Sequence, residues 1–196
     1  FAAASKIALP TDKIQGKFDG EFTVKMPLLP EMEPDTVAIT GKAKITEVKS
    51  REKIGIINVQ SGSVDVQLDE TQAAANGELI LNGVLAKIEW RKPMTPGGPA
   101  TAPLSLTANL DNADRRQLGI DIEDYVAGDV PVTVSFESPE GAEPVIRVAA
   151  DLTPADLSIA PLAWKKPRGS AAKLVFDVTS GTTHKTELQN FKVTGD

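Results

Sequence analysis

Alternation of apolar and polar residues with a period of two runs through most of this 196-residue chain. Between positions 37 and 46, for example, Val37, Ile39 and Ile45 lie on one side of the alternation and threonines and lysines on the other. Successive side chains of a β-strand point to opposite faces of a sheet, so this spacing predicts a strand with one apolar face. The pattern recurs at 64–68, 104–110, 130–136, 146–152 and 174–178.

Turn-forming sequences separate most of these segments, among them Asn82-Gly83 and Ser180-Gly181. They predict meandering antiparallel strands, because glycine and asparagine accept the positive φ that tight reversals need. Two short helical turns are also expected. One covers 113–118, capped by Asp111 or Asn112, and the other covers 153–157. We therefore predict an all-β, mainly antiparallel fold with one or two short helical connectors.

Composition excludes several classes of function. A net charge of −6 leaves no broad basic surface for nucleic acid, and the absence of cysteine with only one histidine, His184, rules out disulfide, thiolate and multi-histidine chemistry. The chain carries no nucleophile elbow and no phosphate-binding loop. The carboxylates at 121–124 and 65–70 lack the spacing of a calcium loop and are expected on solvated surfaces. We predict a protein that is not an enzyme and that needs no cofactor or metal.

A repeated sequence pattern suggests how the chain is organised. Trp90-Arg91-Lys92-Pro93 precedes a glycine turn and a new alternating strand, and so does Trp164-Lys165-Lys166-Pro167. Repetition of such an order is typical of a multi-strand unit used twice along an elongated sheet. The expected organisation is a single β-rich segment over 1–196 that belongs to a larger protein, with two related sections at about 1–111 and 112–196.

Four segments of the C-terminal half follow one another in a distinctive order, at 113–121, 125–134, 151–157 and 164–169, and a glycine-punctuated unit lies upstream at 77–90. Together these segments resemble the large AsmA-like envelope proteins of alphaproteobacteria. The resemblance implies an elongated, curved or taco-like sheet with an apolar concave face, in a periplasmic protein held to the inner membrane through a region absent from this chain. It also implies a bridge that carries phospholipid towards the outer membrane.

The resemblance assigns the alternating apolar residues to the lipid-facing groove. These are Val37, Ile39, Ile45, Val64, Val66, Leu68, Leu79, Leu81, Leu104, Leu106, Val132, Val134, Ile146 and Val148. The cations Arg91, Lys92, Lys165 and Lys166 are candidates for a rim that meets lipid head groups, or are solvated turn residues. The expected partners are phospholipid or fatty acyl chains and neighbouring sections of the same polypeptide. Contact with the membrane is expected only through regions outside this segment.

Periodicity alone leaves other interpretations open. The apolar face is equally consistent with the inside of a closed β-sandwich, which would make the chain a structural or adhesive module that assembles envelope components through its edge strands. A third hypothesis is a carbohydrate hydrolase that uses the carboxylates around Asp121.

Overall fold

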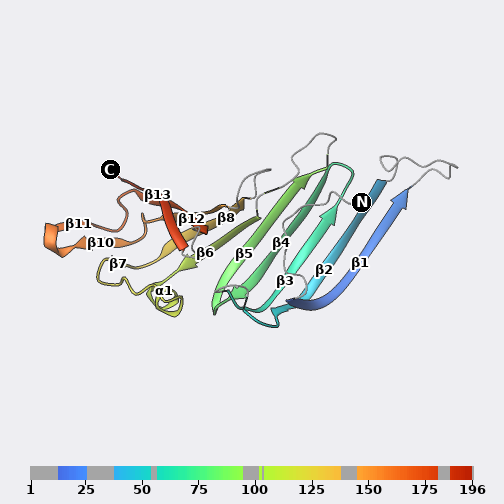
Figure 1. Ribbon diagram of the computed structural model, residues 1–196, viewed down its shortest axis with the longest axis horizontal. Coiled ribbons are helices and arrows are strands. Elements are labelled where there is room, and N and C mark those ends of the chain that lie inside the picture. The colour runs from blue at the N-terminus through green and yellow to red at the C-terminus, as the bar shows by residue number, and fades with distance from the viewer. Residues whose placement is uncertain are drawn as a thin grey trace.

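A computed structural model describes residues 13–25, 38–53, 57–94, 102, 104–137, 145–180 and 186–195. Ten strands form one antiparallel sheet, and their order in the sheet is their order along the chain (Figure 1). In sheet order the strands are β1 (Ile14–Lys25), β2 (Ala38–Ser50), β3 (Val59–Leu68), β4 (Gln72–Leu81), β5 (Val84–Pro93), β6 (Leu104–Leu110), β8 (Val130–Glu137), β9 (Val145–Asp151), β12 (Ala172–Ser180) and β13 (Thr186–Gly195). This confirms the predicted all-β, mainly antiparallel fold.

Two excursions interrupt the meander and meet in a small second sheet. The first, between β6 and β8, contains α1 (Asn112–Gln117) and β7 (Val126–Ala127). The second, between β9 and β12, contains β10 (Asp156–Ile159), the 3-10 turn η2 (Ala160–Leu162) and β11 (Trp164–Lys166). Strands β11, β10 and β7 pair in that order and lie beyond one end of the large sheet (Figure 1).

The sheet is stabilised by two small hydrophobic clusters rather than by a central core. One gathers Val48, Val59 and Leu79 where β2, β3 and β4 meet. The other gathers Val130, Ala150, Leu152, Ala155 and Ala172 where the small sheet joins β8, β9 and β12. Among the described residues, no large side chain is completely buried. Both clusters lie near the ends of strands.

Helix α1 is the predicted connector, and it begins where the sequence indicated. Asp111 caps it by accepting a hydrogen bond from the Asp114 amide, and Gly119 follows its end with a φ of +80°. The buried Arg115 donates to the main-chain carbonyls of Leu110, Val126 and Gly128 at 2.7–2.9 Å. One guanidinium thus ties the end of β6, the helix and β7 together.

The second predicted helical turn is wrong in its position. Residues 152–155 form a hydrogen-bonded turn in which the Ala155 amide donates to the Leu152 carbonyl, and β10 starts at Asp156. Thr153 donates its amide to the Asp151 carboxylate instead of capping a helix. The second connector is η2, where Pro161 fits the early position of a short turn.

Strand β13 is fastened to the sheet through Asp177. Its carboxylate accepts hydrogen bonds from Asn190 Nδ2 at 2.7 Å and from Arg147 Nε at 3.0 Å, which links β9, β12 and β13. Asn190 has a positive φ of 54° and lies opposite the register shift between Val175 and Asp177. These hydrogen bonds hold the pKa of Asp177 below its ordinary value, and the bond from Asn190 has the largest effect.

Acid is expected to loosen β13 through this carboxylate. Because the pKa of Asp177 is lower in the folded protein than in the unfolded chain, its contribution is present above about pH 4 and is lost as the pH falls through the folded value. In an acid titration followed by hydrogen exchange, we expect the β13 amides to lose protection. Asp177→Asn should show weaker protection at neutral pH and a smaller loss in acid. An equal acid loss in wild type and Asp177→Asn would contradict this role.

Candidate functional site

All ten strands of the large sheet present apolar side chains on the same face, which we call the apolar face. Directly paired residues of adjacent strands share a face, so the strand register traces a row across the sheet. The central row consists of Phe18, Ile45, Val64, Gly77, Ile88, Leu106, Val134, Val148 and Phe176. This row contains no polar side chain and crosses nine strands.

The register places the predicted groove residues together. Of the fourteen, Val37 lies outside the described residues, and the other thirteen lie on the apolar face. Twelve of these are half-buried, and Leu79 is buried in the cluster at the ends of β2, β3 and β4. The two-residue periodicity therefore identified one contiguous surface. Its contact with lipid remains a prediction.

The apolar face is open. The strands of the large sheet pack mainly against their sheet neighbours, and in the described ranges no second sheet crosses this face. Its outer strands are the most exposed, with 63% of Phe18 and 63% of Phe191 accessible. Aromatic pairs lie at both ends, Phe18 with Phe22 on β1 and Phe176 with Phe191 across β12 and β13. The closed-sandwich architecture is therefore not the one observed.

The apolar face contains a hollow of about 800 Å³, next to α1. Ala86 and Ala108, which are directly paired, lie in its floor, and Leu106, Val134, Phe136 and Phe176 surround them. Leu118 and Ile120, just after α1, complete the lining on the helix side. This volume falls in the range of ligand-binding cavities, so the apolar face is concave here and large enough for a ligand.

A polar border closes the hollow on the side of α1. The Gln117 amide donates to the Asn82 carbonyl at 2.7 Å, and the Asn82 side chain accepts the amide of Asn58 at 2.8 Å. Asn82 and Gly83 have φ values of 50° and 87°, which suit the tight turn between β4 and β5. Lys53 is the single charged residue among the described residues that line the hollow.

The opposite face, which we call the polar face, has a different character. Ion pairs cross its strands, including Lys44 with Asp65 and Arg147 with Asp177. It also has a hollow, of about 640 Å³, but Lys87, Asp151 and Lys173 contribute to its lining. Charged groups beside a hydrocarbon chain would lose hydration without compensation. The polar face is thus suited to water rather than to hydrocarbon.

The four candidate rim cations lie in different surroundings. Lys92 is half-buried and points to the apolar face, because it pairs with Ala73, whereas Arg91 is exposed on the polar face. Lys165 is exposed on β11 of the small sheet. Lys166 is buried, and its ammonium donates to the carbonyls of Ala155 and Pro167 at 2.8 and 3.1 Å. Only Lys92 borders the apolar face directly.

Two of the carboxylates considered for catalysis, Glu123 and Asp69, accept hydrogen bonds from neighbouring residues. Glu123 accepts from Asn112 at 2.7 Å and pairs with Arg116. Asp69 accepts hydrogen bonds from Thr71 and Gln72, which lower its pKa. Within the ranges that the structure describes, no three His, Cys, Asp or Glu residues gather as a metal site. His184 lies outside those ranges.

Several residues of the apolar face were missing from the predicted set. The largest are Phe18, Phe22, Ile88, Trp90, Phe136, Phe176 and Phe191. The signal for Phe18 and Phe22 was the same two-residue spacing, continued at Val24. Leu118 and Ile120 carried no such signal, because they join the hollow through a connector rather than a strand.

No helix in the described part of the chain has the length and apolarity needed to cross a membrane. Comparison with known proteins found no matching family model, no matching curated protein and no matching solved structure.

Proposed function

We propose that this chain is a non-catalytic section of an AsmA-like envelope protein that holds or conducts phospholipid or fatty acyl chains along its apolar face. The observation that supports it most is the uninterrupted apolar row across nine strands, over which the described residues place no second layer. Shielding a chain from water is worth about 0.8 kcal/mol for each methylene group, so an open apolar surface of this length favours acyl chains without a specific pocket.

The direction of the proposed path follows from the fold. The strands of the large sheet run obliquely to the long axis of the molecule and succeed one another along it (Figure 1), so a chain that follows the apolar row travels roughly along that axis. Side chains on one face stand roughly perpendicular to the sheet, and the row offers no polar group at which an acyl chain would stop. The head group would then travel at the border of the face, where Lys92 offers a cation.

The proposed setting is the periplasm, in a protein anchored to the inner membrane through a region absent from this chain and active in outer-membrane biogenesis. Strands β1 and β13 support a place within a longer sheet, because among the described residues each pairs on one side only and leaves a row of backbone groups without a strand partner. Neighbouring sections of the same polypeptide would pair with these edges and continue the apolar face.

Native mass spectrometry with solvent extraction, on protein purified gently from a bacterial host, tests the proposal. We expect co-purifying phospholipid or fatty acid in the wild type. Val134→Asp places a carboxylate on the apolar face inside the hollow and should remove the bound lipid, because a charge beside hydrocarbon loses its hydration. Thr133→Asp, the adjacent residue on the polar face, is the matched control and should keep it.

The proposal fails if the wild type is folded and lipid-free, or if Thr133→Asp loses lipid as completely as Val134→Asp. Circular dichroism of each variant shows whether a loss of lipid reflects unfolding.

The open edges also favour a second candidate, a structural module that assembles envelope proteins by strand addition at β1 or β13. A stoichiometric protein partner recovered with lipid-free protein would support this module and not the lipid carrier.

A further inference from the structure

The hairpin formed by β10, η2 and β11 projects from one end of the molecule and carries exposed apolar side chains at its tip. In Figure 1 it is the orange hairpin at the far left, beyond β13. Leu162 in the turn is 72% exposed, Trp164 46% and Ile159 37%. Ile159 and Trp164 are a direct cross-strand pair, so their two side chains lie on the same face of the hairpin. These three residues define the hairpin tip.

The base of the hairpin is firmly held, which keeps the tip extended. Leu157 shares a face with Ile159 and Trp164 but packs against the cluster around Val130 and Ala155. The Lys166 ammonium binds two main-chain carbonyls there, and the Arg168 amide donates to Asp156 at 2.8 Å. The apolar face of the hairpin is therefore buried at its base and exposed at its tip. This arrangement presents the tip instead of folding it against the sheet.

Charge around the tip is one-sided. Residues 157–176 contain Lys165, Lys166, Arg168 and Lys173 and no carboxylate, in a chain whose net charge is −6. The carboxylate of Asp156 lies at the base, 3.9 Å from Arg168. The acidic segment 121–124 precedes β7, which is the opposite edge of the small sheet from β11. Lys166 is buried and Arg168 lies beside Asp156, so the exposed charge next to the apolar tip is the ammonium of Lys165.

We propose that the hairpin tip inserts into the interfacial region of a bilayer that contains anionic phospholipid. Tryptophan favours that region because its ring is apolar while its N–H stays hydrated, and the exposed Lys165 beside it would meet anionic head groups. A stable protein interface usually needs about 20–30 residues a side, far more than this tip supplies. The sequence led us to expect membrane contact only outside this segment, and this proposal departs from that expectation. The inference does not depend on the lipid-carrying function.

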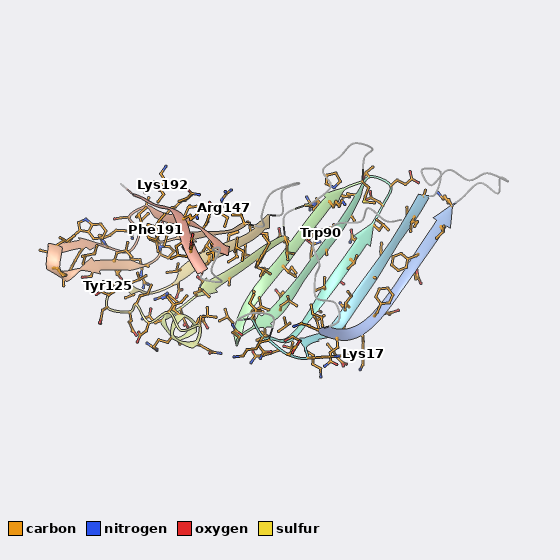
Figure 2. The ribbon with its side chains drawn as sticks, viewed as in Figure 1. Lys17, Trp90, Tyr125, Arg147, Phe191 and Lys192 are labelled. Atoms are coloured by element: carbon orange, nitrogen blue, oxygen red, sulfur yellow. The ribbon has the colours of Figure 1, made fainter. Side chains whose placement is uncertain are left out.

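Two single-tryptophan proteins separate tip insertion from lipid uptake by the apolar face. Trp90→Phe leaves Trp164 as the reporter of the tip, and Trp164→Phe leaves Trp90, which lies on the apolar face (Figure 2). With vesicles of phosphatidylglycerol and phosphatidylcholine, we expect a blue shift of Trp164 and quenching by brominated acyl chains. Vesicles of phosphatidylcholine alone, or high salt, should weaken the response, because cations contribute to binding.

Co-sedimentation with the same vesicles compares the binding of two matched variants. Leu162→Asp should lower vesicle binding at least tenfold, whereas Leu85→Asp, which alters an exposed leucine on the polar face of β5, should leave it unchanged. The inference is wrong if Trp164 shows no shift with anionic vesicles, or if both variants bind equally. A shift confined to Trp90 would also overturn it, and would assign the lipid to the apolar face.

Discussion

Replacing Ala108 with tryptophan is expected to lower the affinity for a long-chain fatty acid about 100-fold while the protein stays folded. Ala108 lies in the floor of the hollow and its side chain points to the open apolar face, so a larger ring has room. An indole there would displace roughly four methylene groups of a bound chain, at about 0.8 kcal/mol each. The sum is near 3 kcal/mol, which corresponds to about two orders of magnitude in Kd.

Displacement of a fluorescent fatty acid measures this change. Thr107→Trp is the matched control, because Thr107 is the next residue along β6 and its side chain belongs to the polar face. We expect that variant to bind like the wild type. Equal affinities of the wild type and Ala108→Trp would place the acyl chain elsewhere on the sheet.

Removing the guanidinium of Arg115 should cost about 3–5 kcal/mol of folding stability, the largest loss expected from one exchange in this chain. Arg115→Ala leaves the carbonyls of Leu110, Val126 and Gly128 without their donor in a buried site. An unsatisfied buried polar group costs roughly 1–3 kcal/mol, although relaxation and water entry lower the total for three such groups. Domains are stable by about 5–15 kcal/mol, so this variant should unfold at much lower denaturant concentration.

Urea denaturation followed by circular dichroism checks this prediction. Arg116→Ala is the control, since Arg116 is exposed on the same helix and pairs with Glu123 at the surface. Surface ion pairs contribute about 0–1 kcal/mol, and the control should therefore shift the midpoint only slightly. Comparable losses in the two variants would mean that the buried contacts of Arg115 contribute little.

The two-residue period was sufficient to predict the faces of the large sheet. It separates Ile39 from Thr40 and Val134 from Thr133, and the register places each pair on opposite faces. The same arithmetic distinguishes Lys92 from Arg91, because Lys92 lies two residues after Trp90 and shares its face. The helix at 112–117 was also predictable, from its aspartate cap and the glycine beyond it.

The small sheet was not predictable in this way. Strands β7 and β11 have only two and three residues, too few for a period to emerge. Their partner is a segment 30 residues away from β7 along the chain, so only the folded structure brings them together. The buried states of Arg115 and Lys166 have the same origin, since both bind main-chain carbonyls that distant segments supply. Sequence patterns favour solvent for such cations.

The even number of strands in the large sheet determines which strand direction a neighbouring unit needs in order to extend it. Because strand direction alternates and ten is even, β1 and β13 run in opposite directions. A second unit of the same kind could therefore pair its first strand antiparallel to β13. Its apolar face would then continue the apolar face of the first unit. Strands in a sheet are about 4.8 Å apart, so each such unit would extend the sheet by roughly 48 Å. A unit with an odd number of strands would not tile this way.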